Sequence, residues 1–267
     1  MIVTRNGISY LSFDLFEKAH ITAAVSCRDG GVSEAPFASL NMGFHTGDDP
    51  AAVRENRKRF LETLHIDPGS AVSCVQVHGT HIADIGPEER GRGAFSYDDA
   101  LPGTDGLVTA EKGIALTLNY ADCTPLLLAD PVKGVIALAH GGWRGTAGNI
   151  AGKTADRMVS RYGCRREDIL CAVGPALCRD HFEVGGEVIQ AMAGLFSAEE
   201  TEALTAAGTA GKYFFDLPGA NAKLLEHAGI PKEHIEQCGL CTWEDPHFYS
   251  YRREKGKTGR HMAVIVL

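Results

Sequence analysis

The sequence of 267 residues predicts an α/β fold with mixed β-sheets and flanking helices. Short apolar runs rich in branched residues alternate along the whole chain with segments of helical periodicity. Several of these runs stop at glycine, aspartate or histidine, as strands do where they end. No internal repeat or linker divides the sequence, so we expect one domain over residues 1–267.

The first half of the chain contains one helix with clear boundary signals. Residues 50–64 are expected to form it, because Asp49 can cap it, Pro50 suits its first turn, and apolar residues recur on one side. The ranges 39–49 and 87–103 are expected to be loops. Strands are expected at residues 24–33, 71–77, 106–109, 114–119 and 126–129.

The second half alternates more regularly between strands and helices. An apolar run over 135–140 ends at His140, and residues 146–162 after it are expected to be helical. Further helices are expected at 182–196, 197–207 and 217–228. Further strands are expected at 169–173, 235–238, 248–252 and 262–267.

Composition excludes several classes of function. The net charge of −8, from 26 basic and 34 acidic residues, argues against a general binder of nucleic-acid backbones. No run approaches the roughly 20 apolar residues of a membrane helix, so no membrane partner is expected. The first ten residues lack the pattern of a signal peptide. With eight cysteines expected to stay reduced, we expect a cytoplasmic protein.

Cys238 and Cys241 form the only C-x-x-C pair of the sequence. A structural zinc site usually needs a second such pair. Cys171 and Cys178, seven residues apart, match that requirement poorly. The pattern therefore favours neither a structural zinc site nor a redox site at this pair.

The segment around His140 is the most informative part of the sequence. A glycine-rich turn with Trp143 and Arg144 follows His140 and leads into the expected helix. Backbone N–H groups at a helix start bind anions, whereas a cation there opposes the helix dipole. Arg144 is therefore a candidate ligand for an anionic substrate.

His78, Cys123 and His140 stand at comparable places, each at or beside the end of an apolar strand. Two imidazoles and a thiolate form a plausible catalytic zinc site, which leaves a fourth position for water. The same residues also fit a metal-free cysteine hydrolase, with Cys123 as the nucleophile and His140 or His78 as the base. The residues are scattered, so a buried thiol and two hydrogen-bonded histidines is a third interpretation.

Other candidates lie near turns. Arg252 and Arg253 follow an aromatic run, and arginine binds phosphate or carboxylate through its planar fork. Their charged neighbours also fit a solvated hairpin tip. Glu183 is placed to cap a helix or to act as an acid or base.

Taken together, these segments resemble the YfiH-like family, which has a laccase-type domain. The similar segments run from early to late in the chain and are listed here: 39–43, Asp48, Asn56, 76–78, 104–106, 121–125, 140–145, 174–175, 182–184, 248–253 and 259–260. Gly141 stands where alanine is usual, and Phe182 where tyrosine is frequent.

The resemblance implies a layered α/β/β/α fold and zinc bound by His78, Cys123 and His140. It also implies a purine nucleoside phosphorylase, acting on adenosine, inosine, guanosine and methylthioadenosine with phosphate, that has adenosine deaminase activity. Glu183, Asp105 and Arg144 are the catalytic candidates, with one of the two carboxylates transferring protons in deamination and Arg144 holding phosphate. The substrate-binding candidates are Asn41, Gln76, Arg144, Phe182, Arg252 and Arg253.

Other interpretations stay open beside this one. Family members have also been described as copper-dependent polyphenol oxidases, but none of the 11 histidines lies in an H-x-H pair of the kind that multicopper oxidases use. Copper is therefore disfavoured. A non-enzymatic metabolite or metal binder is a further alternative. We expect a monomer or a small homo-oligomer.

Overall fold

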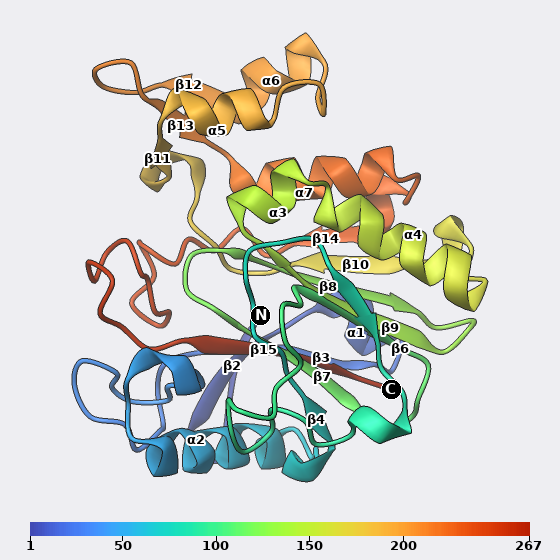
Figure 1. Ribbon diagram of the computed structural model, residues 1–267, viewed down its shortest axis with the longest axis vertical. Helices are drawn as coiled ribbons and strands as arrows, with labels where there is room; N and C mark the ends of the chain where they lie inside the picture. The colour runs from blue at the N-terminus through green and yellow to red at the C-terminus, as the bar shows by residue number, and fades with distance from the viewer.

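The computed structural model describes residues 1–267 as two packed β-sheets with helices on their outer faces (Figure 1). The first sheet is mixed, because β4 and β7 run parallel and its other neighbours run antiparallel. Its strands, in spatial order, are β1 (Ile2–Arg5), β2 (Ile8–Ser12), β3 (Thr22–Ser26), β15 (His261–Val266), β7 (Ala115–Tyr120) and β4 (Ala71–Val72).

The second sheet is also mixed and contains two seven-residue strands, β8 and β9, that are buried throughout. Every residue of β8 and β9 is buried, because sheet and helices cover both faces. This explains why both strands appear in the sequence as nearly continuous apolar runs. The spatial order is β14 (Ile235–Gln237), β10 (Leu170–Val173), β8 (Thr124–Asp130), β9 (Val135–Gly141), β6 (Gly106–Thr109) and β5 (Ile82–Asp84).

The helices form the two outer layers. Helix α2 (Pro50–Thr63) covers the first sheet, and α3 (Trp143–Ala147), α4 (Ile150–Tyr162) and α7 (Leu217–His227) cover the second (Figure 1). The largest buried cluster, with 22 residues, joins side chains of both sheets and is therefore the central core. The α/β fold with mixed sheets and flanking helices is confirmed.

A small lobe projects beyond the layers (Figure 1). It consists of the sheet β11 (Glu183–Val184), β13 (Tyr213–Phe215) and β12 (Thr205–Ala207) with α5 (Gly186–Ala191) and α6 (Ala198–Leu204). Its own apolar cluster includes Phe182 and Phe215. Besides these elements, α1 spans Asp14–Lys18, and 3-10 helices lie at Phe44–Thr46, Pro68–Ser70, Pro87–Glu89, Arg166–Asp168, Arg179–His181 and Lys232–His234.

Several expected elements differ from the observed ones. The single helix expected at 146–162 is wrong, because Asn149 adopts a left-handed φ of 57° and its side chain accepts the N–H of Gly152, which starts a new helix. The strand expected at 248–252 is a loop, and the helix expected at 182–196 begins as strand β11. Strands β1 and β2 were not expected from the sequence.

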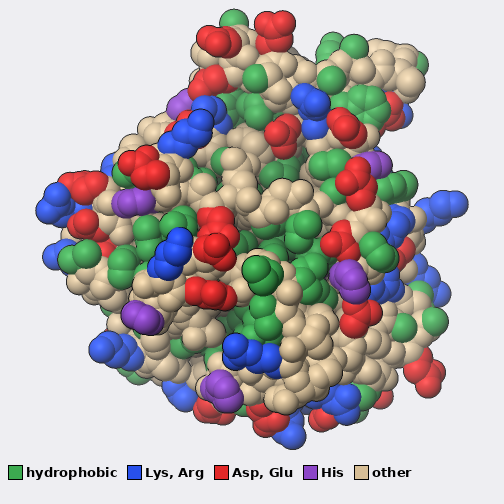
Figure 2. All heavy atoms as spheres, turned by 180° about the vertical axis from the view of Figure 1, so that it is seen from behind, with side chains coloured by type: hydrophobic (Ala, Val, Ile, Leu, Met, Phe, Trp, Pro, Cys, Tyr) green, Lys and Arg blue, Asp and Glu red, His purple; other side chains and the backbone are tan.

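None of the helices combines the length and apolar character that crossing a bilayer requires. On the face shown in Figure 2, basic and acidic side chains are interspersed, without the continuous basic patch typical of proteins that bind nucleic-acid backbones.

Candidate active site at the ends of both sheets

The fold brings His78, Cys123 and His140 together. His78 lies in the loop between β4 and β5, Cys123 in the turn between β7 and β8, and His140 within β9. Their ligand atoms all lie within 4.8 Å of one another. The predicted triad is thus a real spatial cluster, drawn from segments of both sheets.

Asp105 orients two of these three residues. Its carboxylate lies 3.0 Å from His140 Nδ1 and accepts the backbone N–H groups of Val77, His78 and Gly79 at 3.1, 2.9 and 2.7 Å. Burial would raise the pKa of Asp105, but the hydrogen bonds from His140 and the backbone outweigh it and lower that pKa. The ionised carboxylate therefore directs the other ring nitrogen of His140 toward the cluster.

The turns that carry the cluster are conformationally strained. His78 has a φ of 60° and Asp122, next to Cys123, has a φ of 84°. Such backbone angles are costly for residues other than glycine and occur at functional sites. The Asp122 carboxylate stabilises its turn by accepting the Thr242 hydroxyl at 2.7 Å and the Arg252 N–H at 2.6 Å.

Gly142 leaves open the space beside the three candidate ligands. A Cβ atom at this position would lie 3.0 Å from His78 Cδ2, 3.2 Å from Cys123 Sγ and 3.5 Å from His140. The absence of a side chain therefore keeps the approach to the cluster free. A half-buried thiol, two imidazoles and an orienting carboxylate match the donor set of a zinc site with an open position.

The three residues also influence one another's protonation. Burial would raise the pKa of Cys123, but the charge and hydrogen bonds of His140 and His78 lower it to about 6. Burial would lower the pKa of His140, but Cys123 and Asp105 raise it to about 9. Without a metal, these opposite shifts favour a thiolate beside an imidazolium.

The cluster opens into a cavity of about 490 Å³, a size typical of small-molecule sites. Aromatic side chains on its wall are Tyr97, Phe182 and Tyr251, and polar ones include His45 and Asn119. Gln76 also lines it and is held by two hydrogen bonds of 2.9 Å to the backbone of Asn119.

Two arginines line the same cavity, Arg252 and Arg260. Neither forms an ion pair with a carboxylate, and Arg260 donates to the carbonyl groups of Thr258 and Gly259. The guanidinium of Arg252 lies 5.6 Å from the ring centroid of Phe182. Two cations without acidic partners make the cavity suitable for an anion.

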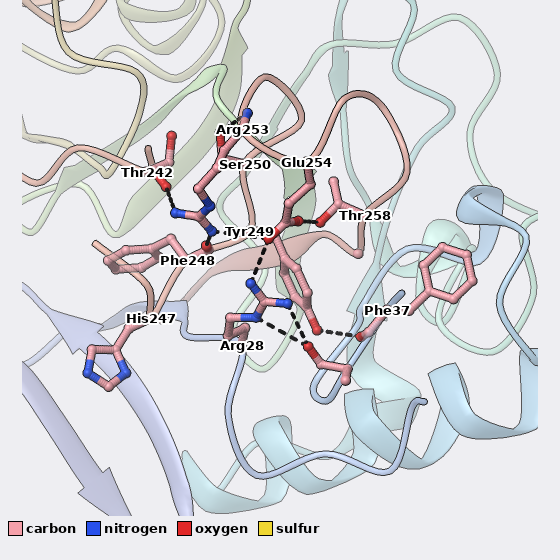
Figure 3. A network of polar contacts seen from close by, with 12 residues as sticks. Arg28, Phe37, Thr242, His247, Phe248, Tyr249, Ser250, Arg253, Glu254 and Thr258 are labelled. Atoms are coloured by element: carbon pink, nitrogen blue, oxygen red, sulfur yellow. Dashed lines mark hydrogen bonds and ion pairs between the residues drawn. The ribbon is translucent and has the colours of Figure 1, made fainter. Parts of the chain in front are cut away.

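The loop that carries Tyr251 and Arg252 is held by the polar network of Figure 3. Arg253 donates to the carbonyl groups of Thr242, Trp243, Asp245 and Phe248. Arg28 pairs with Glu254 at 2.7 Å, and its guanidinium stacks 4.6 Å from the Tyr249 ring centroid. Arg253 therefore supports the cavity wall from behind and is absent from the lining.

Comparison with known proteins shows which family the chain resembles. Residues 22–267 match the family described as "Multi-copper polyphenol oxidoreductase laccase". The purine nucleoside phosphorylase YlmD of Geobacillus stearothermophilus is 40% identical over 92% of this chain and 90% of its own. The adenosine deaminase RL5 of an unknown prokaryotic organism is 35% identical over 86% of this chain and 87% of its own. The crystal structure of the Bacillus licheniformis hypothetical protein YfiH has a TM-score of 0.94 and 35% identity, covering 100% of this chain and 98% of that one.

The chain belongs to the YfiH-like laccase-domain family. The resemblance noted in the sequence is thereby confirmed. In this YfiH-like chain, Gly141 also has a physical explanation: an added Cβ would lie 3.0 Å from both the Asn221 amide nitrogen and the Thr124 carbonyl oxygen.

The YfiH-like fold does not bring every predicted residue to the cavity. Arg144 is exposed, with its guanidinium 4.1 Å from the Trp143 ring centroid. Glu183 bonds to Lys212 at 3.0 Å and Thr209 at 2.8 Å. Asn41 is buried and bonds to Asp48 at 2.8 Å. Direct roles for these residues stay predictions that the cavity's geometry does not favour.

Other residues of the YfiH-like cavity were not among the predicted sites. His45, Tyr97, Asn119, Tyr251 and Arg260 received no site role from the sequence, although Tyr251 and Arg260 lie in segments that resemble the family. Arg260 follows a glycine and precedes an apolar run, which was the available signal, and His45 lies in a polar loop. Their relevance depends on segments far apart in the chain folding to one cavity.

Proposed function

We propose that this protein is a zinc-dependent purine nucleoside phosphorylase that also deaminates adenosine. Adenosine, inosine, guanosine and methylthioadenosine are the proposed nucleosides, cleaved with phosphate to the free base and a ribose 1-phosphate. One observation carries the proposal: His78, Cys123 and His140 converge at a cavity that also presents aromatic faces and two unpaired arginines. The names of the relatives support the same reaction classes.

The residues present fit a zinc ion held by His78, Cys123 and His140. When bound, the ion would supply Lewis-acid chemistry, which polarises a coordinated oxygen or increases the acidity of water. Asp105 positions His140 and shapes the turn of His78. We therefore assign Asp105 a positioning role in preference to proton transfer.

Among the other cavity residues, we assign one group to binding the purine and the two arginines to binding phosphate. Phe182, Tyr97 and Tyr251 offer ring faces on which a purine can stack. The side-chain oxygen of Asn119 is buried without a partner, so its amide is available for polar recognition. Burial and, to a lesser extent, the nearby Arg260 and Arg57 together lower the pKa of His45 to about 4, so this imidazole is neutral near pH 7 and can hydrogen-bond to the base.

In phosphorolysis, a phosphate oxygen forms a bond to C1′ of the ribose while the bond from C1′ to the purine nitrogen breaks. The bond's electrons leave with the purine, which then takes up a proton. Arg252 and Arg260 can hold the dianionic phosphate through charge-assisted hydrogen bonds. In deamination, water replaces the amino group of adenine, and the group leaves as ammonia.

The test is a paired assay on the purified protein. Adenosine and inosine turnover is followed by chromatography with and without phosphate, alongside metal analysis. We expect base release only with phosphate, inosine formation from adenosine without it, and loss of both after chelation with recovery on adding zinc. Base release that does not depend on phosphate contradicts the phosphorylase proposal, and recovery by copper alone contradicts zinc.

A second candidate is a metal-free cysteine hydrolase, supported by the lowered pKa of Cys123 and its position beside His140 and Asp105. In this mechanism the Cys123 thiolate attacks an amide carbonyl, His140 donates the proton to the leaving amine, and water then hydrolyses the resulting thioester to release the acid and the thiolate. Full activity in metal-free protein would favour this candidate over the zinc enzyme.

The N-terminal strands support treating residues 1–267 as one YfiH-like domain. Strands β1 and β2 lie before the matched family region, yet β2 pairs with β3 within the first sheet. We further propose that the protein acts in the cytoplasm as a monomer or small homo-oligomer.

A further inference from the structure

A second group of metal-ligating side chains lies outside the cavity. It consists of Cys178, His181, Cys241 and Glu244, which we call the outer cluster. None of these residues lines the cavity of the first cluster. Cys178 and His181 come from the turn after β10, and Cys241 and Glu244 from the turn after β14.

Four of the six donor–donor distances within the outer cluster lie near the edges of a tetrahedral zinc site, and all six lie within 4.8 Å. His181 Nδ1 lies 3.2 Å from Cys178 Sγ, 3.7 Å from Cys241 Sγ and 3.4 Å from Glu244 Oε1. Cys178 Sγ lies 4.0 Å from Glu244 Oε1. Zinc bonds of about 2.3 Å to sulfur and about 2.0–2.1 Å to nitrogen or oxygen give tetrahedral edges of roughly 3.3–3.8 Å.

The backbone holds the two halves of the outer cluster together. The N–H of Cys178 donates to Cys241 Sγ at 3.3 Å, and the N–H of Thr242 donates to the Ala176 carbonyl at 3.0 Å. Each half supplies two ligands three positions apart, the short spacing found in zinc sites. The arrangement therefore depends on packing already present in the fold.

We propose that Cys178, His181, Cys241 and Glu244 bind a second divalent cation of the zinc class. Four protein ligands leave no open position, so the site is structural. Two sulfurs and one imidazole select a thiophilic ion such as zinc over magnesium or calcium.

The position of the outer cluster explains what such an ion would stabilise. His181 precedes Phe182 of the cavity wall and stacks on Trp243, with ring centroids 5.4 Å apart. Thr242, next to Cys241, bonds to Asp122 beside Cys123. The ion would join the entry to the small lobe with the loop that carries Arg252.

The first experiment measures zinc in variants of the whole chain. Cys123→Ser removes a ligand of the first cluster, and this variant should still bind one zinc per chain. Adding Cys178→Ser or Cys241→Ser should remove that zinc, whereas adding Cys238→Ser should not. Cys238 is the matched control, because it is a half-buried cysteine outside both clusters. A Cys123→Ser protein without zinc, or zinc retained in the double variants, overturns the proposal.

A second measurement uses the unmodified chain and does not depend on a variant folding. Zinc should protect Cys178 and Cys241 from alkylation, as located by mass spectrometry, and a chelator should expose them while Cys238 labelling stays constant. If denatured protein contains six titratable thiols in place of eight, Cys178 and Cys241 form a disulfide, and the proposal is overturned.

Glu244→Gln, at a side chain that is 61% exposed, should weaken zinc binding at least about 10-fold without disturbing the core. Unchanged binding in this variant removes Glu244 from the site. These readouts stay valid whether or not the protein cleaves nucleosides.

Discussion

The first cluster and the outer cluster use the same residue types in different surroundings. His78, Cys123 and His140 lie at a cavity, and a fully buried carboxylate, Asp105, orients His140. The outer cluster lies outside that cavity and instead has a fourth candidate ligand, Glu244, on an exposed turn. Three ligands with an open side are typical of catalytic metal sites, and four ligands of structural ones.

The comparison shows that cysteine and histidine content alone does not decide the role of a site. Strained turns at His78 and Asp122, and the missing side chain at Gly142, keep the first cluster open. In the outer cluster, short turns and backbone bonds between them close the donor set. The surroundings therefore favour chemistry at the first cluster and, under our proposal, stabilisation at the outer cluster.

The sharpest way to break this comparison is to remove one thiol from each cluster. Cys123→Ser should reduce phosphorolysis by about 10³-fold or more, because a metal contributes several kcal/mol to the transition state. Cys178→Ser should instead lower the thermal unfolding midpoint by at least about 5 °C, because a structural ion stabilises only the folded chain. Steady-state kinetics and calorimetry check the pair, with Cys238→Ser as the control. Equal loss of activity in both variants would contradict the division of roles.

The next effect concerns the carboxylate that only the first cluster has. Asp105→Asn keeps the shape of the side chain but weakens the orientation of His140. Zinc affinity at the first cluster should therefore fall roughly 10- to 100-fold, as is usual when a group that orients a metal ligand is removed. Competition with a chelator measures this affinity. Zinc at the outer cluster should stay bound, and Asp67→Asn at the exposed surface is the control. If Asp105 instead transfers protons, activity will stay low even with saturating zinc.

The third effect compares arginines at the cavity with an arginine outside it. Arg260→Ala or Arg252→Ala should raise the KM for phosphate roughly 10-fold or more, because each removes a charge-assisted hydrogen bond. Arg144→Ala should change it little, since its guanidinium lies over Trp143. Phosphate titrations at fixed inosine measure all three. The reverse ranking would restore Arg144 as the phosphate ligand.

The last effect is a pH dependence that belongs to the region of the first cluster and concerns stability instead of activity. Burial lowers the pKa of His261 to about 3, and this ring stacks 6.2 Å from Tyr120, whose hydroxyl bonds to the strand of His140. Between that value and the usual 6.5, the unfolded chain binds the extra proton. The neutral His261 therefore makes its full contribution to the stability of the folded protein above pH 6.5, and this contribution is lost as the pH falls toward 3.

His261→Phe should remove this part of the acid sensitivity. Between pH 6.5 and pH 5 the wild type should lose on the order of 2 kcal/mol more unfolding free energy than the variant. Urea unfolding at several pH values measures the difference, with the exposed His81→Gln as the control. Parallel pH curves for wild type and variant would show that His261 is not the buried neutral group.

Much of the fold could be predicted because local signals coincide with the observed elements. Strand β6 covers the predicted residues 106–109, and α2 starts at the predicted proline. The break at Asn149 and the short strands of the small lobe could not be predicted, because apolar periodicity does not register a single left-handed residue or a strand of two residues.

The candidate site was predictable only in part. His78, Cys123 and His140 could be proposed because each follows or ends an apolar run. The orienting role of Asp105 and the cavity positions of Arg260 and Asn119 could not, because they depend on segments far apart in the chain meeting in the fold. The outer cluster escaped for the same reason: Cys241 lies three residues from Cys238 in the chain but is grouped with Cys178, 63 positions away.

The sequence by itself determined the element types, the family and the chemical identity of the candidate ligands, since periodicity, capping residues and donor atoms are local properties. Only the tertiary structure decided which donors converge, which cluster faces a cavity, and which arginines remain unpaired there. The physical reason is that coordination and charge compensation depend on distances of a few ångströms between atoms. Residues 60 or more positions apart reach such distances only when the strands and turns that carry them pack side by side in the fold.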